Sequence, residues 1–318
     1  MAGNDVLSSF LLQDPLLTGW IGTAPPDETR RIATRLAPPA EVFSRTFNYA
    51  KFGKENQRRQ KRSLTRPRGG PFNKMEGLQR TKVPGYVEEK GLEATLDRRD
   101  RDEAIAGAGP NAANAVFNLR TATTFTTKSQ VLNGKEYETS VKLQDPTPYG
   151  AQHSADIANF SNTGVRKWLF GLKRNVRQKA NVAPNALYLA ENIYWEALEN
   201  ADIRKQFPFG DHPIGDAELA TYFRVKEIIV GGDHVLDEDD TPLELWQNTA
   251  ILFYNNPDAG LNGATFAKSF FKKFDNNLPY YVASAFDKNQ NEDLVYAEQY
   301  SPDGCEITFP DAAWLIHA

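Results

Sequence analysis

A stretch of about thirty residues without core-forming side chains most limits what this chain can fold into. Residues 53–85 combine many Lys and Arg with eight chain-breaking residues: Gly53, Pro67, Gly69, Gly70, Pro71, Gly77, Pro84 and Gly85. A loop this long is uncommon inside a compact domain. Prolines also interrupt residues 1–40, whose apolar side chains form only short clusters. The sequence therefore predicts an extended arm and a long loop, which a neighbouring copy or another large partner must support.

Charge is distributed unevenly along the 318 residues. Residues 51–82 carry a local charge of +9, whereas residues 190–318 carry −15. Opposite charges of this kind steer association between proteins. We therefore expect the basic segment to dock on an acidic surface of a neighbouring copy through Arg58, Arg59, Lys61, Arg62, Arg66 and Arg68. Contact with nucleic-acid phosphates is the first alternative, and a solvated loop is the second.

Apolar periodicity predicts a mixture of helices and strands after residue 100. Residues 110–132 favour a long helix whose apolar face would include Ala112, Ala115, Val116, Leu119, Ala122 and Thr123. Further helices are expected over 154–179, 190–201 and 216–223. Apolar runs predict strands over 42–52, 186–189, 225–230, 245–254, 280–286, 294–300 and 306–309. This order of elements indicates an α+β fold, with Ile193, Leu198 and Ile251 among the core side chains.

The predicted helix over 154–179 has one apolar face and one basic face, and Gly164 is a point where it would break. The basic face consists of Arg166, Lys167, Lys173, Arg174, Arg177 and Lys179, with no acid between them. Such a face suits sequence-independent contact with DNA phosphates. A solvated face and a contact between subunits are the other interpretations.

Motifs for catalysis or cofactor binding are missing from the sequence. It has no phosphate-binding loop, no Gly-x-Ser-x-Gly and no His-Glu-x-x-His. The single cysteine, Cys305, is expected to be structural, and a nucleophilic pair with His317 is the alternative. Residues 237–240 are acidic and are expected to form a solvated turn, with a cation site as the alternative. We therefore expect neither an enzyme nor a cofactor, and no apolar run is long enough to span a membrane.

Several segments, taken in order, resemble the major capsid proteins of tailed bacteriophages. The resemblance begins at the strand 182–189 and the helix containing Tyr194-Trp195-Glu196-Ala197-Leu198. It continues through 216–231 and the Trp-containing strand 245–254. Upstream, the aromatic strand at 42–52, the long loop and the return around 86–101 resemble the N-terminal arm and the E-loop of that family.

The resemblance implies the Hong Kong 97-type capsid fold. Its parts would be an N-terminal arm (1–41), an E-loop hairpin (42–101), a P-domain with a long spine helix (102–180), an A-domain (181–279), and closing strands that return through the P-domain and end in the A-domain (280–318). It also implies self-assembly of hexamers and pentamers into an icosahedral virion shell around double-stranded DNA, with portal, scaffold or decoration proteins as further partners. The alternatives are an encapsulin-like compartment shell and a nucleic-acid-binding protein that uses residues 51–82.

Overall fold

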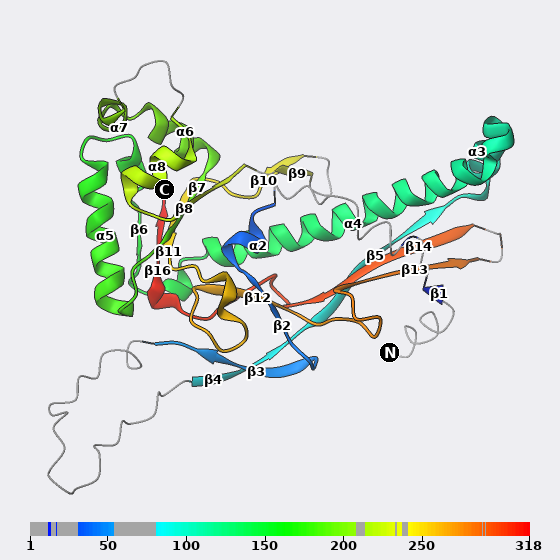
Figure 1. Cartoon of the computed structure of the whole chain (residues 1–318), viewed down its shortest axis with the longest axis horizontal. Helices are drawn as coiled ribbons and strands as arrows, with labels where there is room; N and C mark the ends of the chain where they lie inside the picture. Colours follow the sequence, from blue (N-terminus) through cyan, green and yellow to red (C-terminus); the bar gives the residue numbers. More distant parts are fainter. Residues whose placement is uncertain are drawn as a thin grey trace, which may run out of the picture.

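The computed structural model of the chain describes residues 12–13, 17, 31–53, 81–207, 214–232, 234–236, 241–287, 289 and 291–318. Within these residues the strands form a seven-stranded sheet, a five-stranded sheet and two separate strand pairs. Helices gather around the five-stranded sheet, and one long helix extends from there along strands of the seven-stranded sheet (Figure 1). The predicted α+β class is confirmed.

The five-stranded sheet lies at the centre of the largest apolar core. Its strand order is β6 (His153–Ser154), β16 (Ala313–His317), β11 (Thr249–Phe253), β7 (Ala186–Ala190) and β8 (Glu227–Gly231). Every side chain of β7 and β11 is buried. Strands covered on both faces appear in a sequence as continuous apolar runs, which explains why both could be predicted. β11 is shorter than the predicted strand 245–254, because Leu245 and Trp246 precede the paired residues.

The helices that contribute side chains to this core include α5 (Val165–Ala180), α6 (Glu191–Glu199), α7 (Ala201–Gln206) and α8 (Asp216–Phe223). The helix predicted over 154–179 begins only at Val165, since Gly164 adopts a left-handed conformation with φ of 84°. The helix predicted over 190–201 is two helices, because the backbone of Asn200 is extended and its side chain caps α7. The predicted helix over 216–223 is confirmed.

The seven-stranded sheet lies beside the long helix α4 (Ala112–Gln144) (Figure 1). Its strands are β1 (Leu12–Gln13), β13 (Tyr280–Phe286), β14 (Glu292–Tyr300), β12 (Ala267–Phe271) and β15 (Glu306–Ile307), with β2 (Pro39–Glu41) on β12 and β5 (Glu88–Leu96) on β14. The short helix α3 (Arg98–Ala108) connects β5 to α4 at the far end of the molecule (Figure 1). The helix α5 contacts α8 and β16.

Threonines make up much of the buried face of α4, beside Val131 and Leu143, and the predicted apolar face is only partly buried. Thr121, Thr124 and Thr127 are buried, while Ala122 is exposed. The hydroxyls of Thr124 and Thr127 donate to backbone carbonyls four residues earlier, so they need no partner from the sheet. Small side chains with satisfied hydroxyls pack like apolar ones, a property that apolar periodicity does not detect. The helix also continues to Gln144, beyond the predicted end at residue 132.

A two-stranded hairpin of β3 (Thr46–Lys51) and β4 (Thr81–Tyr86) lies apart from both large sheets (Figure 1). Two-stranded hairpins are marginally stable by themselves. Aromatic contacts attach this one to the body: the rings of Phe47 and Tyr49 lie 4.8 and 5.1 Å from the ring of Phe270 on β12. The hairpin strands lead to and from residues 54–80, which lie outside the described residues.

The side chain of Glu136 connects three parts of the fold. This side chain is 2 % exposed and is one of the buried residues of α4. Its carboxylate accepts hydrogen bonds from the backbone N–H groups of Ile32 and Ala33, at 3.0 and 3.0 Å, where α2 (Ala33–Leu36) begins. It also accepts one from Nε1 of Trp246, at 2.8 Å, just before β11. One buried carboxylate thus ties the N-terminal segment and the five-stranded sheet to the long helix.

We predict that Glu136→Ala destabilises the folded subunit strongly. The change leaves three buried N–H donors without this acceptor, and each such donor costs about 1–3 kcal/mol. The free energy of unfolding of dissociated subunits, measured by urea titration, should fall by about 3 kcal/mol or more. Glu103→Ala, at an exposed position of α3, is the matched control and should change it by no more than about 0.5 kcal/mol. Equal effects of both changes would contradict the role of Glu136.

The core around β7 and β11 gives a graded test of burial. Ile193 and Ile251 are 2 % and 0 % exposed, as predicted from the sequence, but Leu198 is only partly buried. Ile193→Ala and Ile251→Ala should each lower the free energy of unfolding by about 2–5 kcal/mol. Leu198→Ala should cost less than either, because water already reaches part of its side chain. Thermal melts of the three variants check this order, and an equal or larger loss for Leu198→Ala would contradict it.

Candidate interaction surfaces

The predicted docking residues of the basic segment cannot be placed. Arg58, Arg59, Lys61, Arg62, Arg66 and Arg68 all lie outside the described residues, as does the acidic run 237–240. Their predicted contacts therefore remain predictions. What the structure does describe is the hairpin from which the basic segment departs and the surfaces around it.

The base of the hairpin exposes large apolar side chains. Phe43 is 92 % exposed and Tyr86 is 51 % exposed. A hollow of about 590 Å³ lies between the two strands' ends and is lined by Phe47, Pro84 and Val87, among others. Single exposed apolar residues are common on proteins, but Tyr86 lines this hollow, and Phe43 lies two residues before Arg45, which also lines it. This part of the surface is therefore suited to contact with another protein surface.

A second group of exposed apolar side chains lies along α3, α4 and the neighbouring strands β5 and β13. It comprises Leu92, Ile105, Phe125, Tyr137, Val141 and Phe286, on β5, α3, α4 and β13. Phe286, at 63 % exposure, is covered on one side by the guanidinium of Arg101, 5.3 Å from the ring centre. Sequence analysis missed these residues, because a pattern that marks a side chain as apolar does not tell whether its own chain covers it.

The six basic residues of α5 divide into two groups. Arg166, Lys173 and Lys179 are partly buried against their own subunit. The Nζ atom of Lys173 donates to the backbone carbonyls of Phe223 and Arg224, at 3.3 and 2.6 Å, at the end of α8. Lys179 lies over the ring of Trp314, 5.4 Å from its centre. The other three, Lys167, Arg174 and Arg177, are exposed. The predicted basic face therefore serves partly in packing and partly at the surface.

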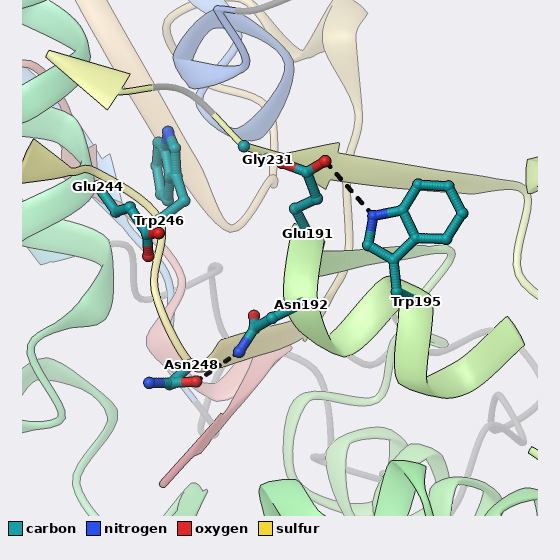
Figure 2. A pocket seen from close by; sticks show the side chains of 8 residues that line it. Glu191, Asn192, Trp195, Gly231, Glu244, Trp246 and Asn248 are labelled. Atoms are coloured by element: carbon teal, nitrogen blue, oxygen red, sulfur yellow. Dashed lines mark hydrogen bonds between the residues drawn. The ribbon is translucent and has the colours of Figure 1, made fainter. Parts of the chain in front are cut away.

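A hollow of about 440 Å³ lies between the start of α6 and the strand β10 (Pro242–Glu244). Figure 2 shows Glu191 and Trp195 on the helix side, facing Glu244 and Trp246 on the other side. Nε1 of Trp195 donates to Glu191 at 3.4 Å, and Nδ2 of Asn192 donates to Asn248 at 2.5 Å. Two carboxylates beside an exposed indole suit a cationic group. No sequence motif marked this hollow, because its walls come from segments about fifty residues apart.

The geometry does not assemble a catalytic site from the residues considered. Cys305 is fully buried, and burial raises the pKa of its thiol, so the reactive thiolate is disfavoured. His317 instead lies 3.3 Å from His153, measured between ring nitrogens. Within the described ranges, no group of three or more His, Cys, Asp or Glu side chains could hold a metal ion. The described helices also include none that is long and apolar enough to cross a membrane.

A buried lysine on β12 has a structural setting. Lys268 is 1 % exposed, and its Nζ atom donates to the carbonyls of Gly260 and Gly263, at 2.6 and 2.7 Å, and to that of Leu261 at 3.2 Å. Burial lowers the pKa of Lys268 from 10.5 to about 8, because removal from water disfavours the charged ammonium. The three contacts hold the loop after β11 against the sheet.

The chain is similar to known proteins in its three-dimensional structure. No protein-family model matches the chain, and no curated protein matches it in sequence. A phage-related protein from Bordetella bronchiseptica RB50 matches over 96% of this chain and 97% of its own, with a TM-score of 0.70 and 18% identity. A protein assigned as a prophage capsid protein from E. coli CFT073 matches over 96% and 99%, with a TM-score of 0.60 and 10% identity.

A third match is a structure from Mycobacterium phage Cain, which covers 91% of this chain and 90% of its own, with a TM-score of 0.50 and 10% identity. At these low identities the likeness concerns the fold. The chain has the Hong Kong 97-type capsid fold, as the sequence resemblance predicted. The helix α4 takes the place of the predicted spine helix.

We predict a pH-dependent contribution of Lys268 to stability. Below about pH 8 the lysine is protonated in both folded and unfolded chains, and its burial costs free energy. Between about 8 and 10.5 the unfolded chain binds more protons, so this cost disappears as the pH rises. The free energy of unfolding of the wild type, relative to Lys268→Met, should therefore increase over this range in urea titrations. A constant difference would show that the three carbonyls keep the ammonium charged.

Proposed function

We propose that this chain is a structural protein that assembles into an icosahedral capsid shell around double-stranded phage DNA. The observation that carries the proposal is the match, along nearly the whole of both chains, to a phage-related protein and to an assigned prophage capsid protein. Each of the two matches covers 96% of this chain.

The surface of the single subunit supports self-association. The hairpin and the α3–α4 end extend from the body, and both carry exposed apolar side chains such as Phe43, Tyr86 and Ile105. Interfaces between subunits bury side chains of this kind. In the proposed shell, hexamers and pentamers would cover these surfaces, and the segment limits 1–41, 42–101, 102–180, 181–279 and 280–318 would describe its arm, loop and domains.

The remaining parts of the proposal concern location and partners. The protein would act in the virion, after assembly in the host cytoplasm, and a portal, scaffold or decoration protein would complete the particle. An encapsulin-like compartment is the closest alternative, since it would use the same kind of shell around a protein cargo. A nucleic-acid-binding protein that uses residues 51–82 would form no shell.

Electron microscopy and gel filtration of the purified protein separate these functions. The capsid proposal expects closed shells or ring-shaped capsomers. Particles isolated from phage-producing cells should contain double-stranded DNA, whereas an encapsulin-like shell would contain protein cargo. A monomer or dimer at every protein concentration would contradict both kinds of shell and favour the nucleic-acid-binding alternative.

Charge reversal in the basic segment is predicted to block assembly. Arg58→Glu, Arg59→Glu and Arg62→Glu, made together, would place acids against the acidic surface of the neighbouring copy. Single exposed ion pairs contribute only about 0–1 kcal/mol, so we expect the effect from the combined variant. Light scattering should show slow or absent assembly, while circular dichroism shows a folded subunit. The matched control changes the same three residues to Lys, which keeps the charge. Normal shells from the Glu variant would contradict docking by this segment.

A further inference from the structure

Three cationic side chains surround the ring of Phe170 on α5. The centre of this ring lies 5.4 Å from the guanidinium of Arg166, 5.9 Å from Nζ of Lys173 and 5.7 Å from the guanidinium of Arg224. The ring faces attract cations, but the cations repel each other. The pKa of Lys173 is accordingly lowered, first by burial and second by the charge of Arg224. This side of α5 therefore concentrates positive charge.

The positive charge continues along the helix. Lys167, Arg174 and Arg177 are exposed, and no salt bridge joins them to an acid in the part of the chain that the structure describes. At a rise of about 1.5 Å per residue, the row from residue 166 to residue 177 is about 16 Å long. α5 thus presents a line of cations rather than a single charged point.

A hollow of about 600 Å³ opens beside the start of this row, where α5 approaches α7 and α8. Of its eight lining residues, Arg166, Lys167 and Lys205 are basic, and Asp202 is the one acid. The carboxylate of Asp202 accepts from the backbone N–H of Gly164 at 2.7 Å and lies 4.0 Å from Nζ of Lys205. Nε of Arg166 is buried and has no hydrogen-bond partner within the described residues. The hollow therefore has an excess of donors and of positive charge.

We propose that this surface, made of the α5 row and the adjacent hollow, binds the phosphodiester backbone of double-stranded DNA without reading its sequence. A row of cations matches a polymer whose charges repeat at regular intervals, and such binding releases counterions. An acidic patch on another protein would need carboxylates arranged in the same line. The inference rests on the proposed function, because it gives the packaged DNA a specific contact on the subunit, and it adds Lys205 and Arg224 to the basic residues found in the sequence.

The test is DNA binding by dissociated full-length subunits. The binding variant combines Lys167→Gln, Arg174→Gln and Arg177→Gln, and the matched control combines Arg45→Gln, Arg98→Gln and Arg99→Gln, at exposed positions just before β3 and on α3. Anisotropy of a short fluorescent duplex is measured between about 50 and 200 mM salt. The plot of log affinity against log salt should become shallower by about 2–3 for the binding variant, since each phosphate contact contributes about 0.9.

We also expect the binding variant to lose affinity by about tenfold or more at the lowest salt, while the control keeps wild-type affinity and slope. Circular dichroism verifies that both variants are folded. No DNA binding by the wild type, an unchanged slope in the binding variant, or an equal loss in the control would overturn the proposal. If the binding variant bound DNA normally but failed to assemble, the cationic row would instead form a contact between subunits. If the wild type formed no shells, the capsid function would be contradicted. The DNA measurement would remain valid, because it uses dissociated subunits.

Discussion

A buried carboxylate holds the parts of this subunit together. Glu136 would be costly to bury by itself, because a charge removed from water must find hydrogen bonds in the protein. The N-terminal segment supplies two backbone N–H donors and Trp246 supplies an indole N–H, so the arm, the long helix and the five-stranded sheet meet at one side chain. The close approach extends to Gly231, where a Cβ atom would lie 2.7 Å from Ile32 and 2.9 Å from Tyr188. A side chain at Gly231 would push these layers apart.

This arrangement produces a subunit with one well-packed centre and two extended parts. The side chains of the apolar core around β7 and β11 pack against one another. The hairpin, by contrast, is attached through contacts of Phe47 and Tyr49 with Phe270. The long helix is packed against the strands partly through small threonines and partly through Val131 and Phe117. Extended parts with exposed apolar groups suit a protein whose final environment includes other copies. The cationic row on α5 lies on the packed part, which would keep its charges at constant spacing for a polymeric anion.

Several local predictions succeeded because one local cause dominated. The continuous apolar runs at 186–189 and 280–286, and the helix at 216–223, follow from burial patterns visible in a short window. The break at Gly164 follows from the conformational freedom of glycine. The threonine face of α4 was missed because back-bonded hydroxyls make polar residues suitable for burial. The strands β16 and β12 were missed as well.

Local patterns in the amino-acid order were thus enough for the α+β class, most core strands, the basic face of α5 and the resemblance that predicted the fold. The tertiary structure alone decided which of those basic residues reach the surface: Lys173 is held by the end of α8, while Arg174, the next residue, is exposed. It also decided that Glu136 is buried and accepts hydrogen bonds from two distant segments, although nothing around it in the sequence distinguishes it from a surface glutamate. The reason is physical. Whether a charged side chain is buried or exposed depends on donors, rings and carbonyls that distant segments bring to it. The periodicity of residues along the chain does not reveal these contacts.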